Sequence, residues 1–110
     1  MTHLSLQEEK ALAEFKKRVR KALGDQVVSF TLFGSRARGE GHEESDLDIL
    51  ALLQERTSER RREIIHIASD IFLEYEIDIS PLVLGQTEFQ NLKDRELLIA
   101  QEIERDGIQL

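Results

Sequence analysis

The chain has 110 residues, 40% of them hydrophobic, which predicts a single globular domain over residues 1–110 rather than a disordered chain. Fifteen basic and twenty-two acidic side chains give a net charge of −7, which argues against broad, non-specific binding to nucleic acid. The sequence has no cysteine, no apolar run long enough to span a membrane and no signal-peptide pattern, so we expect a cytoplasmic protein without disulfides.

The first predicted element is a helix over residues 5–23. Ser5 and Glu8 have the spacing of a capping box, and Gly24 follows the last apolar position. Apolar residues recur between them at helical spacing, at Leu12, Phe15, Val19, Ala22 and Leu23. This pattern predicts an amphipathic helix with one buried face.

Three runs of β-branched and apolar residues predict strands over residues 27–33, 47–53 and 77–84. The segment 36–45 is polar and rich in glycine, and it predicts a short helical turn followed by a loop. A final short strand could form over residues 108–110.

The remaining segments predict helices. A long helix over residues 57–75 places apolar side chains on one face, at Ile64, Ile65, Ala68, Ile71 and Phe72. A short helix is predicted over about residues 87–92, with Thr87 as its cap, and a last helix begins at Asp94 and ends at Gly107. The order of elements predicts an α+β fold, a small mixed β-sheet with helices packed on one face.

Three aspartates are the candidate metal ligands. Asp46 and Asp48 lie two residues apart at the start of the second strand, so both carboxylates face one side of the sheet. Asp78 has the same alternation in the third strand. Aspartates of this kind are common on solvated strand faces. If the three converge, however, their mutual repulsion favours a cation such as Mg²⁺ or Mn²⁺ among them.

A glycine-serine turn precedes these aspartates. Gly34 and Ser35 follow a predicted strand, where a backbone without a side chain can approach a phosphate closely. Such a turn is by itself usually only a turn. Arg36 and Arg38 add positive charge, although they could equally form salt bridges to nearby glutamates, at Glu40, Glu43 and Glu44.

Together these residues resemble the signature of the minimal nucleotidyltransferases, a family of the DNA polymerase β-like nucleotidyltransferase superfamily. The resemblance lies in Gly34-Ser35, then Ala37-Arg38-Gly39, a short spacer, and Ser45-Asp46-Leu47-Asp48. The order of elements and the third aspartate extend it over nearly the whole chain. It implies the polymerase β-like nucleotidyltransferase core.

The resemblance also implies roles for individual residues. Gly34 and Ser35 would bind the β- and γ-phosphates of the nucleotide, which is ATP if the transferred group is AMP. Asp46 and Asp48 would hold two Mg²⁺ ions, and Asp78 would complete the catalytic site. Arg36 and Arg38 would either contact phosphate or brace the loop. We assign no catalytic role to the histidines, at His3, His42 and His66.

The implied partner is a HEPN-domain toxin. Minimal nucleotidyltransferases resembling this chain act as antitoxins that add AMP to a tyrosine of the HEPN ribonuclease, bind it, or do both. The chain is too short for an acceptor domain of its own, and its acidic charge suits a basic partner. The alternatives are an antitoxin that only binds, and nucleotidyl transfer to a small molecule or an RNA end. Homo- or hetero-oligomers are possible.

Overall fold

The computed structural model describes residues 4–40 and 46–110, and its elements follow the predicted order. The first half contains α1 (Leu6–Leu23), the 3₁₀ turn η1 (Gly24–Gln26), β1 (Val27–Phe33) and the short helix α2 (Ser35–Arg38). The second half contains β2 (Leu47–Leu53), α3 (Ser58–Tyr75), β3 (Ile79–Gly85), α4 (Gln86–Asp94), α5 (Leu98–Asp106) and β4 (Ile108–Gln109). The third strand begins at Ile79, two residues later than predicted, so Asp78 directly precedes it.

The strands form one mixed sheet in the order β3-β2-β1-β4. β2 and β3 are parallel, with Leu47 beside Ile79, whereas β1 is antiparallel to both β2 and β4. Phe33, the last residue of β1, lies opposite Asp48 of β2. The predicted α+β fold with a mixed sheet is therefore confirmed.

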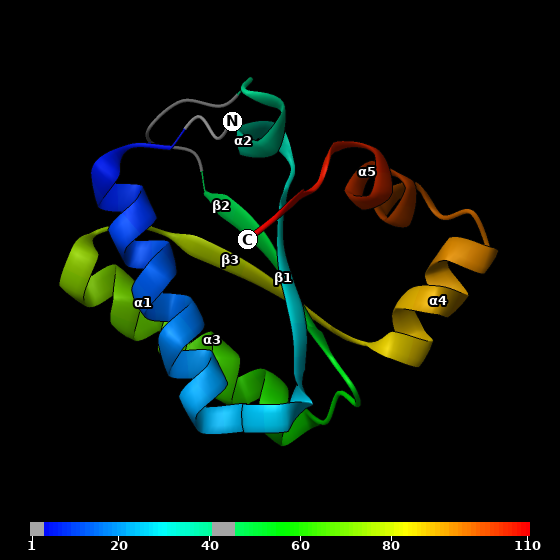
Figure 1. The fold of residues 1–110 in the computed structure, drawn as a ribbon, viewed down its shortest axis with the longest axis horizontal. Coiled ribbons are helices and arrows are strands. Elements are labelled where there is room, and N and C mark those ends of the chain that lie inside the picture. The colour runs from blue at the N-terminus through cyan, green and yellow to red at the C-terminus, as the bar shows by residue number, and fades with distance from the viewer. Residues whose placement is uncertain (1–3, 41–45) are drawn as a thin grey trace.

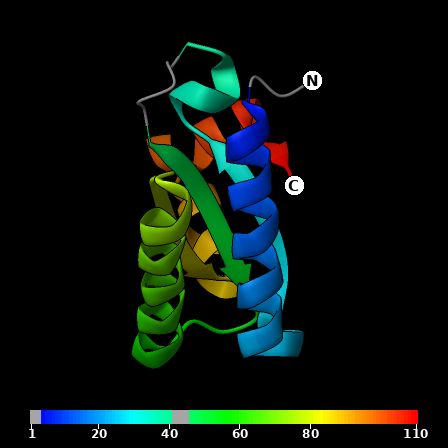
Figure 2. The same ribbon diagram turned by 90° about the vertical axis from the view of Figure 1, so that its left-hand side faces the viewer.

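The main core lies between the sheet and the two long helices. α1 and α3 lie side by side over one face of the sheet (Figures 1 and 2). Their apolar stripes meet the inward positions of β2, namely Leu47, Ile49, Ala51 and Leu53. Phe15 of α1 and Phe30 of β1 pack edge to face, with ring centroids 6.0 Å apart.

The expectation that all helices pack on one face is wrong, because α4 and α5 cover part of the opposite face (Figure 1). Leu50 and Leu84 point to that second face and pack with Phe89 of α4 and Ile103 of α5. Both faces of these strands therefore carry apolar side chains, and a sheet of this kind must be covered on both sides. This second layer reaches the end of β1, because Phe33, which lies opposite Asp48, packs in the same cluster as Ile103 of α5.

The boundaries of the last two helices also differ from the prediction. Asp94 ends α4 instead of beginning the last helix, and Leu97 precedes α5. α4 continues directly from β3 because the Glu88 carboxylate accepts a hydrogen bond from the Gly85 N–H at 2.9 Å, which caps the helix before Thr87. Gly107 follows α5 as predicted. Within the described residues, no helix has the length and apolar character needed to cross a membrane.

Candidate active site

The turn between β1 and α2 requires a glycine at position 34 for two independent reasons. Gly34 has a φ of 77°, a conformation that side chains of L-residues rarely adopt. A Cβ atom at this position would also overlap Oδ2 of Asp48. The backbone of the turn therefore lies directly against one of the predicted metal ligands. Its carbonyl then accepts hydrogen bonds from Ala37 and Arg38, which begins α2.

The three predicted aspartates lie at the same end of the sheet. Asp48 is in β2, and Asp46 and Asp78 immediately precede β2 and β3. Because Leu47 pairs in parallel with Ile79, the register brings Asp46 beside Asp78, and the Leu47 N–H donates to the Asp78 carbonyl at 3.0 Å. Across the sheet, the order is therefore Asp78 at the β3 edge, then the β2 aspartates, then Gly34 at the end of β1.

The aspartates oppose one another's ionisation. Burial, and then the charge of Asp46, raise the pKa of Asp48 above its usual value. Burial also raises the pKa of Asp78, together with the charge of Asp46 and a hydrogen bond to it. Both shifts indicate a site where added positive charge would be stabilising. In the described part of the chain, however, no three acidic or histidine side chains are grouped closely enough to form a ready metal site.

A buried ion pair ties α2 to the start of α1. The Arg36 guanidinium donates through Nη1 and Nη2 to the two carboxylate oxygens of Glu8, at 2.5 and 2.6 Å. The side chains are only 4% and 3% exposed, and they are the buried charged residues of the described chain. Arg36 is thus paired with Glu8 of the same chain in this structure, which favours a role in bracing the loop over a contact with phosphate.

Glu8 also caps α1. Its Oε1 accepts a hydrogen bond from the Ser5 N–H at 2.8 Å, while the Ser5 Oγ accepts one from the Glu8 N–H at 3.1 Å. Burial alone would raise the pKa of Glu8, but the hydrogen bonds from Arg36 and Ser5 outweigh it, and the pKa is lowered. The same carboxylate therefore begins α1 and anchors the helix that follows the Gly34 turn.

Comparison with known proteins shows the family. The profile described as "Nucleotidyltransferase domain" matches residues 12–107, which is most of the chain. The chain belongs to this nucleotidyltransferase family. This nucleotidyltransferase is similar to "Putative protein adenylyltransferase MJ0141" of Methanocaldococcus jannaschii, with 44% identity over 69% of this chain and 78% of the relative. It is also 36% identical to "Putative protein adenylyltransferase MJ1305", over 66% of this chain but only 52% of that relative.

Solved structures share the fold of this nucleotidyltransferase. A structure described as a minimal nucleotidyltransferase has a TM-score of 0.59 and 23% identity, with both chains covered completely. A crystal structure of a toxin-antitoxin with AMP-PNP has a TM-score of 0.57 and 19% identity, covering 86% of this chain and 68% of the other. At these identities the likeness supports the polymerase β-like α+β fold, in agreement with the family.

The remaining predicted residues of the nucleotidyltransferase lie around the same turn. Ser35 is the first residue of α2, and Arg38 is exposed at its end, with Nε donating to Glu40 at 2.9 Å. That hydrogen bond is the largest cause of the raised pKa of Arg38. His66 is exposed on α3, with Nε2 3.8 Å from Asp70. Ser45 and the other two histidines lie outside the described residues.

Two features escaped the sequence reasoning. Glu8 was interpreted only as a cap, although a buried arginine partner lies 28 residues away. Phe72 was placed on the buried face of its helix, but it is 49% exposed and Ile67 is buried instead. The neighbouring Leu73 is 77% exposed, which is unusual for so large an apolar side chain.

Proposed function

We propose that this nucleotidyltransferase transfers AMP from ATP to a tyrosine hydroxyl of a cognate HEPN-domain toxin, and so acts as a cytoplasmic antitoxin. The observation that carries the proposal is the contact between the Gly34 turn and the Asp48 carboxylate. It brings a phosphate-binding type of backbone turn against Asp48, an aspartate whose pKa is raised. The relatives named as protein adenylyltransferases support AMP as the transferred group and a protein as the acceptor.

In this proposal, the nucleotide lies on the β1 side of the site. The backbone of Gly34 and the hydroxyl of Ser35 bind the β- and γ-phosphates, since no side chain at position 34 holds them away. Arg38 adds a mobile positive charge at the surface, because its exposed pair with Glu40 is weak and can be exchanged for phosphate. Arg36 stays with Glu8 and holds α2 in place.

Asp46, Asp48 and Asp78 would hold two Mg²⁺ ions. Their oxygen donors are of the type that Mg²⁺ prefers, and the raised pKa values of Asp48 and Asp78 fit a site that gains from added positive charge. When bound, such ions lower the pKa of an attacking hydroxyl and stabilise the charge of the leaving pyrophosphate.

The reaction is an in-line exchange at the α-phosphorus. The tyrosine oxygen forms a bond to the α-phosphorus as the bond to the pyrophosphate oxygen breaks, pyrophosphate leaves, and the hydroxyl proton passes to the Asp78 carboxylate. Asp78, at the β3 edge, would lie on the acceptor's side, because Gly34 is on the β1 side and the proposal puts the phosphates there. The solved toxin-antitoxin structures of this fold support the choice of a toxin as the acceptor.

The test is incubation of the HEPN-domain protein with ATP, Mg²⁺ and the nucleotidyltransferase, which is added at about a tenth of the toxin concentration so that modification requires turnover. Intact-mass spectrometry should show the toxin gaining the mass of AMP, with loss of ribonuclease activity. Asp48→Ala is the control, because it removes a site carboxylate while leaving the surface intact. Neutralisation only at equimolar amounts, without a mass change, would instead indicate an antitoxin that only binds.

A further inference from the structure

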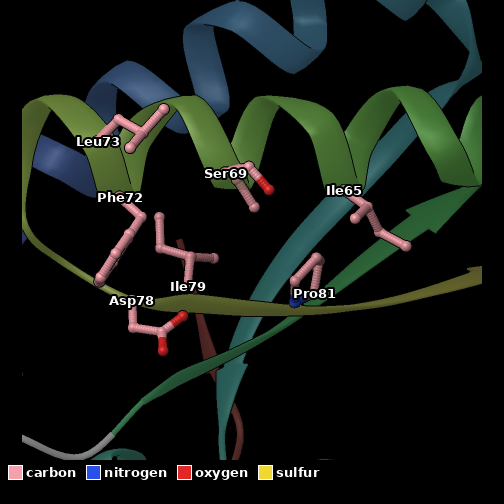
Figure 3. A pocket seen from close by; sticks show the side chains of 8 residues that line it. Ile65, Ser69, Phe72, Leu73, Asp78, Ile79 and Pro81 are labelled. Carbon is pink, nitrogen blue, oxygen red and sulfur yellow. The ribbon is translucent and has the colours of Figure 1, made fainter.

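An apolar groove of about 340 Å³ runs between α3 and the start of β3 (Figure 3). Its lining is apolar except for Ser69 and Asp78, and comprises Ile65, Ala68, Phe72, Leu73, Ile79 and Pro81. Phe72 and Leu73 are among the most exposed large apolar side chains of the described chain. Exposed apolar side chains gathered beside a functional carboxylate are typical of a surface that binds another molecule.

The groove lies on the acceptor side of the proposed site. In the sheet order β3-β2-β1, the groove borders β3, whereas the Gly34 turn follows β1. Figure 3 shows the Asp78 carboxylate pointing away from α3, so Asp78 lines the groove at the start of β3 while its carboxylate is directed away from the helix. A molecule seated on Phe72 therefore needs to pass only around the beginning of β3 to reach Asp78.

The charged residues near the Asp78 end of the groove are mainly acidic. Residues 67–92 include five acidic side chains and no lysine or arginine, and Asp70, Glu74, Glu76 and Asp78 come from the groove region. Arg18 of α1 pairs with Glu74 at 2.5 Å, so the acidic character is only partly compensated by neighbouring elements. Such a surface disfavours a second copy of itself and attracts a partner with basic side chains.

We infer that this groove docks the acceptor protein through an apolar segment flanked by basic residues, and so presents its hydroxyl to Asp78. The inference rests on the proposed function and specifies which surface of the nucleotidyltransferase selects the acceptor. Docking energy from this groove would be used to orient the hydroxyl, because positioning two reactants lowers the barrier of a transfer reaction.

The test compares a double variant, which combines Phe72→Gln and Leu73→Gln, with the single variant Leu98→Gln. Leu98 is a matched control, because its exposed fraction of 68% is similar to that of Leu73 but α5 lies over the other face of the sheet. Glutamine preserves helix propensity and removes only apolar surface. For each protein, calorimetry measures the affinity for the HEPN-domain protein and, separately, for a non-hydrolysable ATP analogue with Mn²⁺. Gel filtration gives the oligomeric state.

The double variant should bind the HEPN-domain protein at least about tenfold more weakly than the parent, as expected for loss of a central apolar contact, with unchanged affinity for the ATP analogue. Leu98→Gln should match the parent in both titrations. Equal toxin affinity in the double variant and the control would overturn the groove assignment. Lost nucleotide affinity in the double variant would assign the groove to the nucleotide, and a dimer that dissociates in the double variant would assign it to a second copy. Failure of the parent to bind the ATP analogue would refute the proposed function instead.

Discussion

Replacing Glu8 with glutamine is expected to destabilise the fold strongly. The substitution keeps the shape of the side chain but leaves the Arg36 guanidinium, 4% exposed, without its carboxylate. Breaking a buried ion pair by removing one partner costs about 3–5 kcal/mol, a large part of the roughly 5–15 kcal/mol that stabilises a domain. At about 4 °C per kcal/mol, the midpoint of thermal unfolding should fall by roughly 12–20 °C.

Circular dichroism melts of Glu8→Gln and Ser5→Ala measure this effect. Ser5→Ala removes the hydroxyl that accepts the Glu8 N–H but leaves the ion pair, so it should cost only about 1 kcal/mol. The pKa of Glu8 in the folded state is below its ordinary value of about 4.5. Its ionised form therefore contributes fully to stability above about pH 4.5, and this contribution is lost as the pH falls through the folded-state pKa. The difference between parent and Glu8→Gln should therefore shrink in acid. Equal melting points for Glu8→Gln and Ser5→Ala at pH 7 would refute the structural role of the pair.

Three further predictions concern the turn and the carboxylates. Gly34→Ala should abolish binding of an ATP analogue, because its Cβ would overlap Asp48. Gly24→Ala is the control, since Gly24 also has a positive φ but has open space around it. This control should lose only about 1–2 kcal/mol of stability and bind the analogue normally in the same titration. Asp48→Asn should raise the melting point at pH 7, since the raised pKa of Asp48 means that its ionised carboxyl destabilises the fold. The gain should vanish below about pH 3.5, where the parent carboxyl is also neutral. A gain that persists in acid would contradict this cause. Arg38→Ala should weaken affinity for the ATP analogue but leave the melting point nearly unchanged, because its pair with Glu40 is exposed. Unchanged nucleotide affinity would remove Arg38 from the phosphate site.

Local sequence patterns predicted most of the fold, because they act over a few residues. The capping box at Ser5 and the glycine after Leu23 gave the bounds of α1 within one residue. Strand alternation placed Asp46 and Asp48 on the face opposite the main core, and this follows from the period of a strand alone. The proximity of Asp46 and Asp78 also required the parallel pairing of β2 with β3, which alternation could not establish.

The features that were missed depend on contacts between distant parts of the chain. Glu8 and Arg36 come together only after α1 packs beside α2, and the cap alone already explained an acidic residue at position 8. Helical periodicity identifies an apolar stripe but not how far a neighbouring layer covers it, so Phe72 at the stripe edge was misplaced. The helices α4 and α5 were both predicted, but helical periodicity does not tell which face of a sheet a helix covers, so their place on the second face was missed.

Titration of a non-hydrolysable ATP analogue in the presence of Mn²⁺ tests most directly whether the Gly34 turn and the aspartates form a nucleotide site. The parent should bind the analogue only when the metal is present, and binding should raise its melting point, since a ligand of the folded state stabilises it. The double variant Asp46→Asn with Asp48→Asn should stay folded and show no metal-dependent binding. Binding of metal and analogue by the folded double variant as tightly as by the parent would contradict the account.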